Sequence, residues 1–153
     1  MKLIGDFGKH LTAFLIQKKY GEKTTTVIRV ESDKTRYGLT IENGIPNSPF
    51  SKRTRIVVNT RRHDSQPEVI PPTKEQLSDL SKEDEGGEFD LWISYVKFKY
   101  QDQQLSFEVF LLPAEELSED DFGHRKQIRM ERVKEKAKLK GLWFHSRSSV
   151  ANQ

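Results

Sequence analysis

The chain has 153 residues, of which 34% are hydrophobic and 32% charged, the size and composition of one globular domain. It contains no cysteine, which excludes a disulfide scaffold, a thiolate zinc site and a cysteine nucleophile, and which favours a reducing, cytoplasmic location. No stretch of the sequence approaches the ~20 apolar residues that span a membrane, so we expect neither a signal peptide nor a membrane partner.

The first part of the chain predicts one helix and three strands. Apolar residues at three- and four-residue spacing indicate an amphipathic helix over residues 3–20, which Gly21 ends. β-Branched or alternating segments predict strands over residues 24–30, 37–42 and 55–60. The segment between the last two strands contains two prolines and an Asn-Gly turn signal, so we expect a loop there.

Residues 61–88 form a long acidic connection that contains three prolines. A capping-box pattern that begins at Thr73 predicts a short helix through Leu77 and Leu80. We expect residues 81–87 to be flexible. Long connections of this kind are usually functional or mobile.

The second half of the chain predicts a β-hairpin followed by helices. Residues 89–100 give the strongest strand signal, and residues 105–112 return as their antiparallel partner across a polar turn. A short helix is expected over residues 113–117, and a longer basic helix over residues 127–140. We expect Leu142-Trp143-Phe144 to pack against the body of the domain.

Together these elements predict an α+β fold. We expect a single domain over residues 1–145, built on a small mixed sheet of five strands with an N-terminal helix and C-terminal helices. Residues 146–153 are expected to form a flexible C-terminal tail.

Charge falls into three blocks along the chain. Residues 1–62 carry thirteen Lys/Arg and five Asp/Glu, residues 63–122 carry four and sixteen, and residues 123–153 carry nine and two. Two basic blocks that meet in space would form a positive face suited to a polyanion. The alternative is that the blocks neutralise one another within one fold or across a homodimer.

Common catalytic and cofactor motifs are absent from the sequence. It contains no phosphate-binding glycine loop and no nucleophile elbow, and its four histidines show no metal-ligand spacing. We therefore expect no resident cofactor and no metal.

Three segments carry a family resemblance. Residues 4–11 read Ile-Gly-Asp-Phe-Gly-Lys-His-Leu, residues 37–60 are two strands joined by a loop, and residues 89–117 contain two strands of which the second ends in Leu-Leu-Pro. In this order they resemble the first helix, the catalytic hairpin and the closing strands of PD-(D/E)XK nucleases of the restriction-enzyme class. The resemblance implies a restriction-endonuclease-like fold and a nucleic-acid ligand.

The family's catalytic residues are missing at the matching positions. The family needs an Asp on one strand and Glu-x-Lys on the next, so that carboxylates hold Mg²⁺ and the lysine positions the attacking water. Here the Asp position falls near Gly38, the Glu-x-Lys falls on Val57-Val58-Asn59, and the helix Glu falls on Lys9. The resemblance therefore implies a protein that has lost the ordinary active site.

Three acids near the supposed site offer an alternative. Glu31, Asp33 and Glu42 would be the candidate catalytic residues if the protein were an active Mg²⁺-dependent endonuclease with a relocated site. The other interpretation is that they are solvated turn acids.

Basic residues gather in two regions, around the third predicted strand and along the last predicted helix. Lysine and arginine contacts to phosphate give salt-dependent affinity with little sequence preference. Trp143 and Phe144 follow the basic helix, and aromatic side chains beside a basic groove can stack on bases. The candidate nucleic-acid-binding residues are Lys52, Arg53, Arg55, Arg61, Arg62, Arg125, Lys126, Arg129, Arg132 and Lys136.

Three functions follow from these observations. The first is a nuclease-like, catalytically inactive protein that binds nucleic acid, with DNA expected, or that serves in a nucleic-acid-processing complex. The second is an active metal-dependent nuclease with a relocated site. The third is a protein-interaction or inhibitor module that engages a basic partner through its acidic block, residues 63–122.

Overall fold

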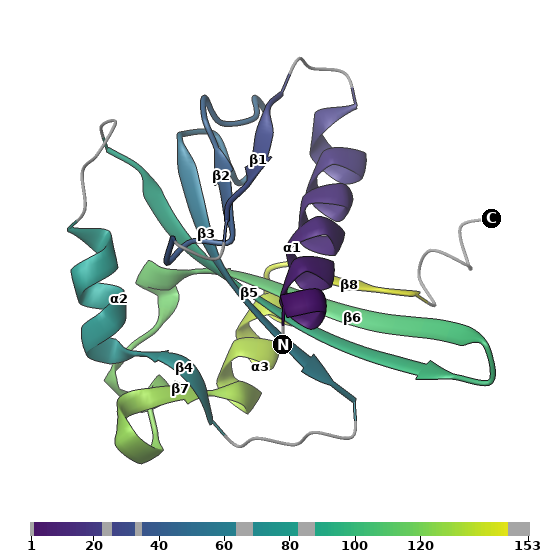
Figure 1. Ribbon diagram of the computed structural model, residues 1–153. Helices are drawn as coiled ribbons and strands as arrows, with labels where there is room; N and C mark the ends of the chain where they lie inside the picture. The colour runs from purple at the N-terminus through teal and green to yellow at the C-terminus, as the bar shows by residue number, and fades with distance from the viewer. Residues whose placement is uncertain (1, 23–25, 33–34, 64–68, 83–87, 147–153) are drawn as a thin grey trace.

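The computed structural model describes residues 2–22, 26–32, 35–63, 69–82 and 88–146 (Figure 1). It is an α+β fold with a six-stranded mixed sheet and a separate two-stranded sheet. The large sheet contains, in spatial order, β1 (Ile28–Val30), β2 (Leu39–Ile41), β3 (Thr54–Arg62), β5 (Asp90–Gln101), β6 (Gln104–Pro113) and β8 (Trp143–His145). The small sheet pairs β4 (Val69–Thr73) with β7 (Gln127–Arg129), and the helices are α1 (Lys2–Ile16), α2 (Lys74–Ser81) and α3 (Met130–Leu139).

The large sheet lies between helices. On one face, α1 packs over a cluster that includes Leu39, Ile56 and Val96, and on the other α2 and α3 pack over a cluster that includes Ile93 and Leu112. β1, β2 and β3 are antiparallel neighbours, β3 runs parallel to β5, and β6 is antiparallel to both β5 and β8. The expected hairpin of residues 89–100 and 105–112 is confirmed as β5 and β6.

The strand count differs from the expected five because three short strands were missed. Residues 69–73 form β4 within the expected connection, residues 127–129 form β7 in place of the first turn of the expected helix, and residues 143–145 form β8. Ile70 and Ile128 lie opposite each other and are fully buried, which stabilises the β4–β7 pair. Strands of three to five residues carry too few side chains to show a period.

Two local expectations at helix ends have clear outcomes. The capping box of α2 is confirmed: Thr73 Oγ1 accepts from the Gln76 N–H at 3.1 Å, and Gln76 Oε1 accepts from the Thr73 N–H at 2.9 Å. The short helix expected over residues 113–117 is a 3₁₀ turn, Ala114–Glu116. The expected flexible segments 81–87 and 146–153 lie largely outside the described residues. In the described part of the chain, no helix is long and apolar enough to cross a membrane.

Helix α1 packs unusually close to β3. A Cβ atom on Gly8 would lie 1.8 Å from Thr60 Oγ1, so only a glycine fits at this contact. The close approach fixes the next residue of α1, Lys9, above the β2 and β3 strands, where the family resemblance places its site.

Candidate functional site

The supposed catalytic hairpin brings Lys9, Gly38 and Val58 together. A Cβ atom on Gly38 would lie 2.7 Å from Val58 Cγ2 and 3.3 Å from Lys9 Cγ. Lys9 Nζ donates a hydrogen bond to the Glu31 carbonyl oxygen at 3.1 Å. An aliphatic side chain and a lysine stem therefore fill the space above Gly38.

The other two matched positions point away from that space. Val57 packs against the core cluster under α2 and α3, on the opposite face of the sheet from Val58. Asn59 shares that opposite face by strand alternation, and its Nδ2 donates to the Pro71 carbonyl oxygen at 3.3 Å. The positions assigned to the Glu-x-Lys motif thus do not converge with Gly38.

The acids proposed for a relocated site are held in ion pairs. Arg29 lies 2.7 Å from Glu31 and 2.6 Å from Glu42, and Arg53 lies 3.5 Å from the other oxygen of Glu42. Burial alone would raise the pKa of Glu31, but hydrogen bonds from Arg29 and Thr40 lower it below its usual range. Asp33 lies outside the described residues. Among the residues that are described, no group of three or more His, Asp or Glu side chains is placed to hold a metal ion.

Two of the predicted nucleic-acid-binding residues at the start of β3 are largely covered. The Arg53 side chain is 14% exposed and faces Glu42. Arg55 is buried, with its guanidinium 4.6 Å from the ring of Tyr37 and 4.8 Å from that of Phe89. Lys52 is exposed, but the cluster that the sequence predicted there is mostly a packing feature.

One side of the basic helix α3 is neutralised by the acidic segment that precedes it. The fully buried Asp121 accepts from Arg132 at 2.8 Å and from Lys136 at 2.5 Å. Burial alone would raise the pKa of Asp121, but these hydrogen bonds and one from the Ser118 N–H hold it at about 2. Lys140 pairs with Glu116 at 2.9 Å. Acidic side chains of the same chain therefore neutralise the lysines and arginine on this side of the helix.

Four other predicted cations are exposed but scattered. Arg62 ends β3, Arg125 and Lys126 occupy a turn in the left-handed conformation, and Arg129 ends β7. They belong to three different elements.

Two rows of side chains cross the sheet beside α3. Residues opposite one another on neighbouring strands, and residues two apart on one strand, share a face of a sheet. The first row, from β3 to β8, is Asn59, Tyr95, Phe110 and Trp143. The second row is Arg61, Lys97, Glu108 and His145. A row of aromatic rings therefore lies directly beside a row of charged side chains.

Helix α3 adds two lysines above these rows. Lys138 Nζ lies 4.5 Å from the ring centre of Trp143, and Lys134 Nζ lies 5.9 Å from that of Phe110. Trp143 is 36% exposed, and its ring centre is 4.2 Å from that of His145. A hollow of about 430 Å³ opens beside Trp143 and His145, and Lys97 and Glu108 also line it. We call this surface the basic aromatic face; it consists of Lys97, Lys134, Lys138, Trp143 and His145.

Like charges crowd this face. Burial lowers the pKa of Lys134, and the nearby ammonium of Lys97 lowers it further. Glu108 is the acid among them: it lies opposite Lys97 on β6, and it accepts a hydrogen bond from Trp143 Nε1 at 3.0 Å. Three lysines around one carboxylate leave a net positive surface that a bound anion would stabilise.

The sequence identified this face only in part. Arg61 belongs to the second row, Trp143 was noted beside the basic helix, and Lys134 and Lys138 lie within the basic helix predicted to bind nucleic acid. Lys97 and His145 were not among the predicted binding residues. Alternation along residues 89–100 was the available signal, because it places Lys97 on the same face as Tyr95.

Comparison of the chain with protein-family models, with curated proteins and with solved structures finds no match.

Proposed function

We propose that the chain binds single-stranded nucleic acid, with DNA as the expected ligand, through the basic aromatic face, and that it does not cleave it. The observation that carries this proposal is the exposed ring of Trp143, which is 36% exposed and lies against Lys138 and His145. The Lys97 and Lys134 pair lies on the same face of the sheet. Base stacking on such a ring contributes roughly 1–3 kcal/mol and tolerates any sequence.

Each part of the face has a role in this proposal. Lys97, Lys134 and Lys138 would contact successive phosphates, which relieves the repulsion among their ammonium groups. Trp143 and His145 would stack on one or two bases. Glu108 would hold the indole in place through its hydrogen bond to Nε1.

The absence of cleavage is part of the same proposal. It is supported by the filled space above Gly38 and by the arginines that already compensate Glu31 and Glu42. The restriction-endonuclease-like fold and a cytoplasmic location are also part of this proposal. The fold is supported by the order of α1, the β2–β3 pair and the β5–β6 hairpin along the chain.

Titration of labelled single strands and matched duplexes, DNA and RNA, at 50 and 200 mM salt tests the binding. Trp143→Ala is expected to weaken single-strand binding about tenfold, and Trp143→Phe to keep most of it. Tyr100→Ala is the matched control, because Tyr100 is 68% exposed and points to the other face of β5. Equal loss in both alanine variants, or no binding at 50 mM salt, would contradict the proposal.

Incubation of the same strands with Mg²⁺ or Mn²⁺ tests for cleavage, and no product is expected. Cleavage that disappears in Glu31→Ala, Asp33→Ala or Glu42→Ala would establish the relocated site instead.

A further inference from the structure

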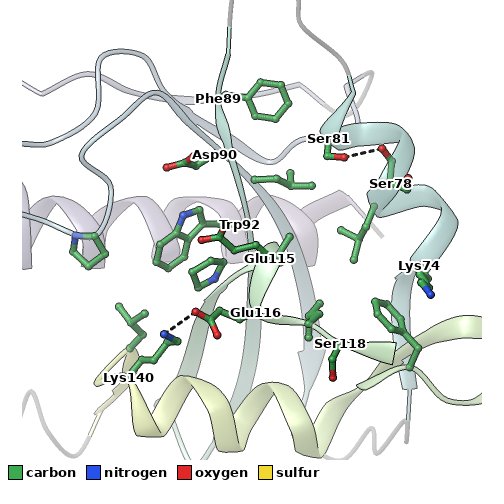
Figure 2. Close-up of a pocket in the computed structure, with 18 of the residues that line it drawn as sticks. Lys74, Ser78, Ser81, Phe89, Asp90, Trp92, Glu115, Glu116, Ser118 and Lys140 are labelled. Carbon is green, nitrogen blue, oxygen red and sulfur yellow. Dashed lines mark hydrogen bonds and ion pairs between the residues drawn. The ribbon is translucent and has the colours of Figure 1, made fainter. Parts of the chain in front are cut away.

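A second cavity, of about 920 Å³, lies at the other end of β5 (Figure 2). We call it the α2–α3 cleft. It lies between α2, the first residues of β5, the segment that follows β6 and the C-terminal end of α3. It therefore lies where the sheet ends and the two core clusters of the protein meet.

Apolar side chains line much of the cleft. Leu77, Leu91, Trp92 and Leu142 belong to the two core clusters, and each is at most 9% exposed. Phe89, Leu117 and Phe122 are partly buried and supply the accessible apolar surface of the lining. A mostly apolar lining with a few polar groups is what clefts that bind ligands or peptides present.

The charged groups of the cleft are mainly acidic. Its lining residues include two lysines, Lys74 and Lys140, and four acids, Asp90, Glu115, Glu116 and Glu119. The lysines are already neutralised, because Lys74 pairs with Glu119 and Lys140 with Glu116. Within the described part of the chain, Asp90 and Glu115 have no ion-pair partner, which leaves a charge of −2.

The position of these two acids suits a chain-like cationic ligand. Figure 2 shows Glu115 near the middle of the residues drawn and Asp90, the first residue of β5, next to Phe89. Partly buried apolar residues line the other part of the cleft, so a fitting ligand offers positive groups to one wall and apolar groups to another. Nucleic acid is excluded by its charge, and the described residues offer no cluster of three acids for a metal ion.

We propose that the α2–α3 cleft binds a protein partner through an extended segment in which arginine or lysine alternates with apolar residues. Alternation in an extended segment sends the cations to one side and the apolar side chains to the other. The cations would reach Glu115 and Asp90, and the apolar side chains would pack against the partly buried Leu117 and Phe122. This inference rests on the cleft alone and is independent of nucleic-acid binding.

Fluorescence anisotropy with short labelled peptides tests it on the intact chain. The probe is Gly-Leu-Arg-Leu-Arg-Gly, and the comparison peptides replace both arginines with glutamate or both leucines with serine. The first peptide is expected to bind and each of the others to bind at least tenfold more weakly. Amide NMR shifts should change around residues 77–81, 89–92 and 113–119.

Matched variants locate the site. Asp90→Asn and Glu115→Gln are each expected to weaken the Leu-Arg peptide roughly fivefold, and Ser78→Trp should obstruct the cleft without changing its charge. Glu131→Gln removes an exposed charge from α3 outside the cleft and should have no effect. Equal binding of the glutamate peptide, unchanged binding in Asp90→Asn and Glu115→Gln, or a loss of the same size in Glu131→Gln would overturn the proposal. Self-association of the chain that Ser78→Trp abolishes would overturn it in favour of a second copy.

Discussion

The two ends of β5 carry surfaces of opposite charge. At Asp90 the strand enters a cleft with uncompensated carboxylates, and seven residues later, roughly 23 Å along the strand, Lys97 lies among lysines and aromatic rings. The difference comes from the elements that pack at each end, since acids of the segment after β6 meet the first and lysines of α3 meet the second. The net charge of +3 is therefore the sum of two separate surfaces of opposite charge.

Removing the lysines at one end should have the largest effect and should leave the other end unchanged. In the triple variant of Lys97, Lys134 and Lys138 to alanine, we expect single-strand affinity to fall about a hundredfold at 0.1 M salt. The slope of log K against log salt should become shallower by about 2, because each contact to a single strand contributes about 0.7. Titration over a range of salt concentrations measures both quantities.

Lys52→Ala is the control for that variant. Lys52 is an exposed cation near the Asp90 end, where Arg53 O accepts from the Asp90 N–H. Affinity should not change in this variant. A loss comparable to that of one α3 lysine would place the nucleic acid on the β3 side and break the proposed separation.

Asp121 distinguishes the neutralised side of α3 from its basic aromatic side. Because the pKa of Asp121 is about 2 in the folded protein and 3.8 is its ordinary value, its stabilising effect is full above about pH 4 and is lost as the pH falls through 2. Asp121→Asn should lower the free energy of unfolding by roughly 2 kcal/mol at pH 7 and flatten its decline between pH 4 and 2. Urea unfolding at several pH values measures this.

Asp120→Asn is the neighbouring control. Asp120 is exposed, so its substitution should change stability by at most a few tenths of a kcal/mol. Equal destabilisation by both substitutions would mean that general charge, and not the buried ion pairs of Asp121 with Arg132 and Lys136, stabilises this region.

Glu108→Gln should give the smallest effect, in the opposite direction. The amide oxygen can still accept from Trp143 Nε1, while the negative charge among the lysines is removed. We expect single-strand affinity to rise about twofold to threefold, and Glu131→Gln on the exposed side of α3 to change it less. Weaker binding in Glu108→Gln would show that the carboxylate itself contacts the ligand.

Local patterns predicted the parts of the fold that depend on near neighbours. Alternation around Trp92 and Tyr95 was enough for the central hairpin, and the Thr73 and Gln76 pair was enough for the start of α2. The short strands β4, β7 and β8 escaped prediction, since each is stabilised by a partner distant in sequence and has no strong signal of its own.

The candidate site was predicted less well for the same reason. The sequence marked α3 as basic, but which of its cations are neutralised depends on Asp121, which reaches Arg132 and Lys136 only in the folded chain. Likewise, the sequence predicted Arg55 as a phosphate ligand, but in the folded chain its guanidinium packs against the rings of Tyr37 and Phe89. Residue type predicts what a side chain can bind, whereas its neighbours decide whether it is still available.

The close contact among Lys9, Gly38 and Val58 has a consequence for the engineering and evolution of this backbone. A carboxylate placed at position 38 alone would collide with Val58, whose Cγ2 lies 2.7 Å from the first added atom, so a single substitution costs stability before it offers a metal ligand. Shortening Val58 alone would leave a void beneath the Lys9 stem. Metal-dependent hydrolysis at this position would thus need several simultaneous substitutions. Because each is unfavourable by itself, stepwise selection would disfavour them.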